Sequence, residues 1–201
     1  MRVAAYVDGF NLYHGMHDAR GRRGLWLDLE SLVSAFLRPG QRLVVVHYFT
    51  ALVAGPGRAA QLTYLDALAA HCPSTLLHVG RFLEKRQTCR GCGSSWRTYE
   101  EKESDVSLAV QLVEDAARKV SDASLILSGD SDMKPAIDAV RRLAPAHRLV
   151  AVFPPRRSSV DLERAVDARL QIFDRVPERH LLPSVVTAPD GRKLLRPFRW
   201  Y

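Results

Sequence analysis

Two aspartates that are separated by one residue, Asp130 and Asp132, follow directly after the apolar run "SLIL" at residues 124–127. Like charges this close repel each other, so the pair is costly unless something compensates for it. One interpretation is local: Asp132 is a good helix N-cap, and Pro135 suits the first turn of a helix. The other interpretation is that the two carboxylates hold a cation that takes part in chemistry.

Further acidic residues occupy comparable places in the chain. Asp8 ends the apolar segment at residues 2–7, with the polar Asn11 shortly after it, and Asp105 opens a helical pattern at residues 105–119. Each also has a local explanation, because Asp is common in turns and its charge is favourable at a helix N-terminus. Taken together, these carboxylates would be destabilising in a basic protein unless a cation lies among them.

Alternating strand and helix patterns predict how these residues are positioned. Short, mostly apolar runs predict strands at residues 2–7, 42–50, 75–80, 124–127 and 148–153. Apolar residues at helical spacing predict helices near residues 29–37, 62–69, 105–119, 137–143 and 160–168. This order predicts an α/β fold with a largely parallel sheet that is covered on both faces.

Ligands of such a sheet bind beyond the carboxyl ends of its strands. We therefore expect four carboxylates and one amide to converge at one sheet edge: Asp8, Asp105, Asp130, Asp132 and Asn11. Carboxylates, retained water and phosphate oxygens are the ligands of Mg²⁺ and Mn²⁺. Because such ions activate water for in-line displacement, the set indicates metal-assisted phosphodiester hydrolysis.

Composition limits the class of protein. The chain has 201 residues, 47% of them hydrophobic, so one domain is expected. Its net charge of +7 favours a polyanionic partner, RNA or DNA; the alternative is a protein that is simply basic. No run reaches the roughly 18 apolar residues of a membrane span, so we expect no membrane partner. The apolar segment at the start is too short for a secretion signal. An odd number of cysteines, 3, argues against a disulfide framework and favours a reducing, cytoplasmic setting.

Two of the cysteines, Cys89 and Cys92, form half of a structural zinc site. Completing a tetrahedral Zn²⁺ site would need Cys72, His71 or His78, or the same pair from a second subunit in a homodimer. The alternative is a reduced surface loop without metal. A thioredoxin-like redox role is disfavoured because the pair does not open a helix.

A basic turn lies before the helical pattern at residues 160–168. Arg156 and Arg157 precede Ser158 and Ser159, either of which could be the N-cap. Guanidinium and backbone N–H groups there would make a phosphate site; the alternative is an exposed basic turn. The tail after Pro177 predicts a hairpin around Asp190–Gly191 and ends in "RPFRWY". That end could stack bases, or it could pack on the sheet edge or on a second subunit.

Four blocks of the sequence resemble a known family. "YVDGFNLYHG" at 6–15, "EKESDVSLAVQLVEDA" at 101–116 and "LSGDSDMKPAIDAV" at 127–140 resemble the three blocks of the NYN domain, a branch of the PIN-like nucleases. "FPPRRSSVDLERAVD" at 153–167 is similar to its fourth block. The resemblance extends over about residues 1–175, with the blocks in the family's order.

The resemblance implies a three-layer α/β/α sandwich, PIN-like and Rossmann-like in topology, with a metal-dependent ribonuclease-like site. The positions that match the acidic metal-binding set are Asp8, Asp105, Asp130 and Asp132, and Asn11 matches the accompanying polar residue. Ser128 and Ser131 match small polar residues that flank the third block, where they would orient the carboxylates or water. With Arg156, Arg157 and Ser158 they are also expected to contribute to substrate binding. The implied domain covers residues 1–176 with a CxxC insert at about 86–99, followed by a basic-aromatic extension at 177–201.

The expected function is a Mg²⁺- or Mn²⁺-dependent ribonuclease. Its alternative is a non-catalytic RNA-binding or regulatory module with a metal-binding pocket. A phosphatase with an Asp nucleophile is disfavoured because "DGFN" at 8–11 lacks the second Asp that such enzymes use. Walker-type and GxGxxG phosphate loops are absent from the sequence, which argues against NTPase and dinucleotide-binding functions.

Overall fold

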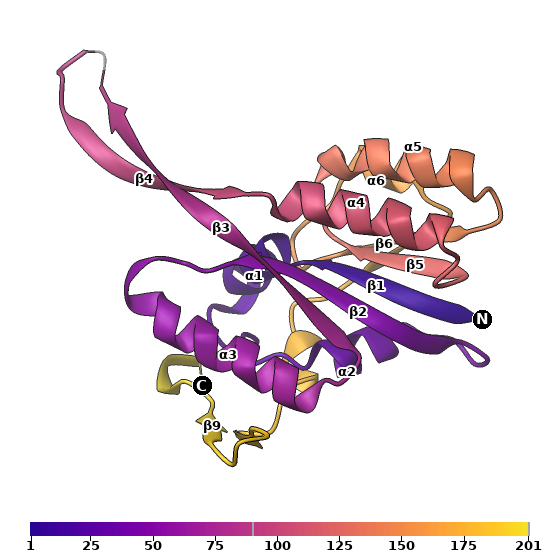
Figure 1. Cartoon of the computed structure of the whole chain (residues 1–201), viewed down its shortest axis with the longest axis horizontal. Helices are drawn as coiled ribbons and strands as arrows, with labels where there is room; N and C mark the ends of the chain where they lie inside the picture. The colour runs from indigo at the N-terminus through magenta and orange to yellow at the C-terminus, as the bar shows by residue number, and fades with distance from the viewer. Residues whose placement is uncertain (90, 201) are drawn as a thin grey trace.

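A seven-stranded sheet forms the centre of the molecule (Figure 1). The computed structural model describes residues 1–89 and 91–200, without the side chains of residues 81–86 and 97–102. Within this part the strand order is β4-β3-β2-β1-β5-β6-β7. The strands are β1 (Arg2–Asp8), β2 (Arg42–Ala51), β3 (Thr75–Thr88), β4 (Ser95–Lys102), β5 (Ala123–Leu127), β6 (Arg148–Phe153) and β7 (Ala168–Gln171). Neighbouring strands are parallel except for the antiparallel pair β3 and β4, so the predicted mostly parallel α/β sheet is confirmed.

Helices cover both faces of the sheet and complete three layers. The α-helices are α1 (Gly9–Arg20), α2 (Leu29–Ser34), α3 (Arg58–His71), α4 (Ser104–Ala117), α5 (Lys134–Leu143) and α6 (Val160–Ala165). Short 3₁₀ turns are η1 (Gly55–Gly57), η2 (Ser131–Met133), η3 (Pro177–Arg179) and η4 (Phe198–Trp200). One apolar core lies between the sheet and α1, α2 and α3, and a second lies between the sheet and α4, α5 and α6. Strand residues of alternating orientation supply both cores, as the two-residue period of a strand requires. No described helix has the length and apolar character needed to cross a bilayer.

Several elements differ from the sequence-based prediction. Strand β3, predicted at 75–80, continues to Thr88. Helix α1 was not predicted, because two of its four buried residues are the glycines Gly9 and Gly15, which hide the apolar period. The helix predicted at 160–168 ends at Ala165, and β7 follows it. Strand β4 was also missed, because its segment is polar and its extended conformation depends on pairing with β3.

The CxxC segment, predicted as an insert at about 86–99, lies at the end of a long hairpin of β3 and β4. Figure 1 shows β3 and β4 extending together away from the sandwich. The pairing runs from Arg81 opposite Lys102 to Thr88 opposite Ser95, so the cysteines occupy the connecting turn.

The C-terminal tail packs on its own chain. It contains the antiparallel strands β8 (Val185–Thr187) and β9 (Lys193–Leu195), which are joined around Gly191, where φ is +85°. Both strands contact α3, and Val186 and Leu194 are buried in the first core. The tail therefore covers α3 rather than the sheet edge that was one of the alternatives.

Candidate functional site

The acidic residues lie at the point where the strand order reverses. Strand β1 lies between β2 and β5, and the chain leaves β1 for one face of the sheet and β5 for the other. Such a switch point creates a crevice beyond the carboxyl ends of the strands. Asp8 is the last residue of β1 and Asp130 follows β5, so both lie at this crevice.

Asp8 is held by residues on both sides of the crevice. It is the N-cap of α1, and its Oδ1 accepts a hydrogen bond of 2.9 Å from the backbone N–H of Asn11. Its Oδ2 accepts a bond of 2.8 Å from the hydroxyl of Ser128. The Asn11 side-chain oxygen accepts in turn from the backbone N–H of Gly129, at 3.0 Å. The first and third blocks of the sequence are therefore joined around a carboxylate that is only 9% exposed.

Ser128 connects the two aspartates. Besides donating to Asp8, its oxygen accepts a 3.1 Å bond from the backbone N–H of Asp130. The side chain is fully buried, so it is placed to orient the carboxylates, as expected, and not to contact a substrate. Asp130, rather than Asp132, caps the turn that follows, since its Oδ1 accepts from the Asp132 N–H at 2.9 Å. The side chains of Asp132 and Ser131 are exposed.

The carboxylates influence one another's ionisation. The pKa of Asp8 is raised to about 6, mainly by burial and further by the charges of Asp105 and Asp130, while its two hydrogen bonds act in the lowering direction. Asp105, in the first turn of α4, has a large exposed area. The surrounding protein nevertheless keeps water from part of its carboxylate, so desolvation raises the pKa of Asp105, and Asp130 and Asp132 add to that effect. The structure thus brings segments 8, 105 and 130–132 into one electrostatic cluster.

The donors of this cluster are those of an open site, where a hard divalent cation keeps several water ligands, and not those of a site closed by protein ligands. Among the described residues, no three His, Cys, Asp or Glu side chains are already gathered so as to hold a metal ion. Its donors are carboxylates, the ligand type with which Mg²⁺ and Mn²⁺ combine several retained waters. A cation there would relieve the unfavourable ionisation of Asp8. The donors are of the type that such an ion prefers, and its binding here stays a prediction.

The arginines of the basic turn form ion pairs within the chain, and phosphate binding there stays a prediction. The Arg156 guanidinium donates to the backbone oxygen of Asp18 at 2.9 Å and pairs with Asp174 at 3.2 Å. The Arg157 guanidinium pairs with the Asp18 carboxylate at 2.6 Å. Both cations are thus engaged with acidic neighbours, and they fasten the turn to α1. Ser159, and not Ser158, caps α6.

Close packing at Gly15 depends on this fastening. A Cβ at Gly15 would lie 2.6 Å from the Pro155 oxygen and 2.9 Å from the Pro154 Cβ. We expect Gly15→Ala to lower the free energy of unfolding by about 1–3 kcal/mol, because the turn must move away from α1. Urea denaturation measures this.

Gly57→Ala is the matched control for that substitution. A Cβ at Gly57 meets its nearest neighbour at 3.4 Å, and φ there is −79°. A loss of stability at Gly57 equal to that at Gly15 would contradict the packing argument.

The two cysteines of the CxxC segment lie close to each other on the hairpin turn. The exposed Cys92 thiol has a pKa lowered to about 7. The main cause is its hydrogen bonds with Ser94, and a hydrogen bond with Cys89 lowers it further in the same direction. The Cys92 sulfur lies 3.0 Å from the Ser94 hydroxyl. Zn²⁺ binding by Cys89 and Cys92 stays a prediction.

The proposed additional zinc ligands are occupied elsewhere. Cys72 is buried and its thiol lies 3.5 Å from the Asp28 carboxylate, with burial raising its pKa to about 12. His71 lies 3.6 Å from the same carboxylate, and His78 contacts His47 at 2.9 Å. In the described residues, these three side chains are therefore committed to the sandwich and not to the hairpin turn.

Sequence reasoning missed a buried polar network between the sheet and helix α4. The Asp115 carboxylate accepts hydrogen bonds from Tyr6 at 2.8 Å, from His47 at 2.9 Å and from Gln111 at 2.9 Å. Burial lowers the pKa of His47 despite the adjacent carboxylate, so the ring is neutral and its Nε2–H donates. Its Nδ1 then accepts from His78. No local signal predicts this network, since its members come from four elements.

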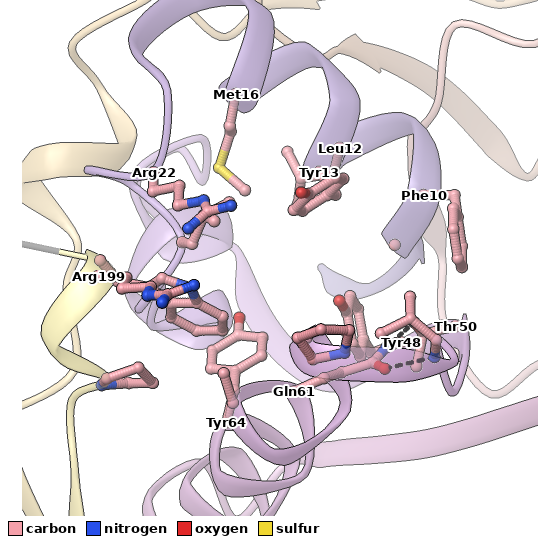
Figure 2. A pocket seen from close by; sticks show the side chains of 18 of the residues that line it. Phe10, Leu12, Tyr13, Met16, Arg22, Tyr48, Thr50, Gln61, Tyr64 and Arg199 are labelled. Atoms are coloured by element: carbon pink, nitrogen blue, oxygen red, sulfur yellow. Dashed lines mark hydrogen bonds between the residues drawn. The ribbon is translucent and has the colours of Figure 1, made fainter.

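A cavity of about 410 Å³ next to the acidic cluster was also missed (Figure 2). Gly9 and Phe10, which directly follow Asp8, line it together with residues of α1, β2, α3 and η4. The lining comes from residues 9–25, 48–64 and 197–200, so only the tertiary structure assembles it.

The fold and the cluster define a class: an α/β sandwich with carboxylates at a topological switch point. A family model of the NYN domain matches residues 2–173. The chain therefore belongs to the NYN domain family, a nuclease-like family, and the family resemblance of the sequence is confirmed.

Two individual proteins are similar to this chain. The 6-hydroxy-3-succinoylpyridine 3-monooxygenase HspA of Pseudomonas putida (strain DSM 28022 / S16) is 27% identical over 253 residues, covering 100% of this chain and 76% of that protein. A crystal structure of a protein of unknown function from Vibrio parahaemolyticus RIMD 2210633 superposes with a TM-score of 0.57 at 18% identity, covering 90% of this chain and 96% of the other. The second likeness shows the fold alone.

Proposed function

We propose that this protein is a metal-dependent ribonuclease that hydrolyses phosphodiester bonds of RNA at the acidic cluster. The observation that carries the proposal is the placement of Asp8: a buried carboxylate at the switch point, with a pKa raised to about 6 and other carboxylates near it. A net charge of +7 would attract a polyanion to this acidic centre. DNA is the other polyanion that this charge would attract.

Particular residues have distinct tasks in this proposal. When bound, Mg²⁺ or Mn²⁺ would lower the pKa of a water molecule and polarise a phosphoryl oxygen. Asp8, Asp105, Asp130 and Asp132 would hold the ion through their oxygens. Ser128 and Asn11 would keep Asp8 and the loop after β5 in place through the hydrogen bonds described above. The exposed carboxylates of Asp105 and Asp132 leave room for water and for a phosphate group.

Cleavage of end-labelled RNA by purified protein tests this function. We expect cleavage with Mn²⁺, none with EDTA, and a loss of at least about a hundredfold in Asp130→Asn, because several kcal/mol of charge stabilisation depend on the bound ion. Asp138→Asn is the matched control, since Asp138 pairs with Lys134 on α5. RNA that is bound but cut equally by wild type and Asp130→Asn would reject the enzyme and favour the non-catalytic binding module.

A second candidate is chemistry on a small aromatic acid, which the name of the Pseudomonas relative indicates for that protein. The observation that favours it is the aromatic cavity adjoining Asp8. Turnover of RNA by wild type and its loss in Asp130→Asn would favour the ribonuclease over this candidate.

A further inference from the structure

The cavity beside the acidic cluster has the size and the walls of a small-molecule site. Its volume of about 410 Å³ lies within the roughly 300–1,000 Å³ typical of ligand pockets. Six aromatic side chains line it: Phe10, Tyr13, Tyr48, Tyr64, Phe198 and Trp200. Aromatic walls favour a planar ring, which they can contact face to face or edge to face.

The tail of the chain builds one wall of this cavity. Trp200 lies with its ring centroid 6.4 Å from that of Trp26 and 5.9 Å from that of Tyr64. Phe198, on the same turn, is 90% exposed. An aromatic side chain left in water at the edge of an aromatic cavity gains buried area when a ligand covers it.

The Gln61 amide and the Tyr64 hydroxyl of the wall are already hydrogen-bonded. The Gln61 side chain accepts from the Val53 N–H at 2.8 Å and donates to the Ala51 oxygen at 2.9 Å. It also donates to the Thr50 hydroxyl at 3.3 Å, as Figure 2 shows. The Tyr64 hydroxyl donates to the Leu27 oxygen at 2.9 Å. These groups therefore shape the cavity and leave recognition of charge to other residues.

Two arginines of the cavity wall have no carboxylate partner among the described residues. Arg22 and Arg199 both line the cavity, and in Figure 2 their guanidinium groups point into it from the same side. Neither forms an ion pair with a carboxylate of the described residues, whereas Arg20, Arg156, Arg157 and Arg192 each do. Guanidinium groups bind carboxylate and phosphate oxygens with paired, charge-assisted hydrogen bonds.

We propose that this cavity binds a planar aromatic molecule that carries an anionic group. Its ring lies among Tyr13, Tyr48 and Tyr64, and its anion contacts Arg22 and Arg199. A nucleotide and a free aromatic carboxylic acid share this chemistry. The inference goes beyond RNA cleavage and holds whether or not the acidic cluster is catalytic, since it needs neither a metal ion nor turnover.

Calorimetric titration of the full chain in EDTA tests the inference, with 5′-AMP and nicotinic acid as probes of the two sources and nicotinamide as the neutral comparison. We expect saturable binding of at least one anion. Nicotinamide should bind wild type about tenfold more weakly than the anion does, because a charge-assisted contact is lost. For the same reason, the anion should bind Arg22→Gln and Arg199→Gln about tenfold more weakly than it binds wild type. The anion that binds more tightly identifies the source.

Two further variants locate the site. Arg38→Gln removes an exposed arginine that does not line the cavity, so its binding should equal that of wild type. Ala60→Phe places a ring inside the cavity from α3 and should abolish binding, with melting curves to verify folding. The proposal would be overturned if neither anion showed saturable binding, or if nicotinamide bound as tightly as the anion. It would also be overturned if Arg38→Gln lost as much affinity as Arg22→Gln and Arg199→Gln, or if folded Ala60→Phe bound the anion as wild type does. RNA cleavage could persist in all of these cases, so the two proposals fail separately.

Discussion

Asp8→Asn is expected to abolish Mn²⁺-dependent RNA cleavage while making the metal-free protein more stable at neutral pH. Asp8 is buried with a pKa raised to about 6, so its ionised form is unfavourable in the folded state. A shift of about two pKa units corresponds to about 3 kcal/mol. Asparagine carries no charge and can still accept one of the two hydrogen bonds made to Asp8, so we expect a gain of about 1–3 kcal/mol in EDTA. We expect cleavage to fall at least about a hundredfold.

The way in which stability depends on pH follows from the raised pKa of Asp8. Between the ordinary aspartate pKa of 3.8 and the folded value of about 6, the folded state binds more protons than the unfolded state. The contribution of Asp8 to stability therefore falls as pH rises through this window, and it stays low above it. Urea denaturation in EDTA at about pH 4 and at about pH 7.5 measures the difference between wild type and Asp8→Asn, which should be present only at the higher pH.

Added Mn²⁺ reverses the order of stability if Asp8 holds the ion. A ligand that binds only the folded state stabilises it in proportion to its affinity, so wild type should melt at a higher temperature with Mn²⁺ and Asp8→Asn should not. Asp161→Asn, an exposed aspartate in the first turn of α6, is the control and should behave as wild type. An Asp8→Asn protein that is less stable than wild type at pH 7.5 in EDTA would contradict the desolvation argument.

Asp115→Ala is expected to give the largest loss of stability, about 3–5 kcal/mol. The carboxylate is 5% exposed and accepts from Tyr6, His47 and Gln111. Alanine leaves the buried Tyr6 hydroxyl and the His47 N–H without an acceptor, and each unsatisfied group costs about 1–3 kcal/mol. The midpoint and slope of urea denaturation measure the loss.

Glu114→Ala on the same helix is the control for Asp115→Ala. Glu114 pairs with Arg118 at the surface, with its side chain 40% exposed, so its removal should change stability by less than about 1 kcal/mol. Equal effects of the two substitutions would mean that helix α4, and not the buried network, carries the loss.

The architecture could be predicted because the strands of the sandwich core have strong local patterns. Segments such as Ala123–Leu127 and Arg148–Phe153 are apolar and buried along most of their length, and their observed bounds lie within one residue of the predicted ones. Helix α1 and strand β4 lack such patterns. The glycines of α1 are there because backbone and proline atoms approach them closely, a requirement that no local pattern expresses.

The acidic cluster could be anticipated for a related reason. Parallel strands place their carboxyl ends at one edge, so residues that follow β1 and β5 must meet. The sequence indicated Ser128 both as a residue that orients the carboxylates and as a substrate-binding residue, and it could not decide between the two roles. Ser128 is fully buried, and the two arginines of the basic turn pair with Asp18 and Asp174.

The sequence by itself therefore determined the α/β class, the family and the aspartates at the strand ends, because these depend on residues close together in the chain and on the order of strands. Only the tertiary structure decided the neighbours of each side chain. Burial raises the pKa of Asp8, Arg22 and Arg199 come to one cavity from opposite ends of the chain, and Asp115 receives donors from two strands. The physical reason is that desolvation, pairing of charges and cavity shape depend on contacts between distant segments, which local patterns of the sequence do not specify.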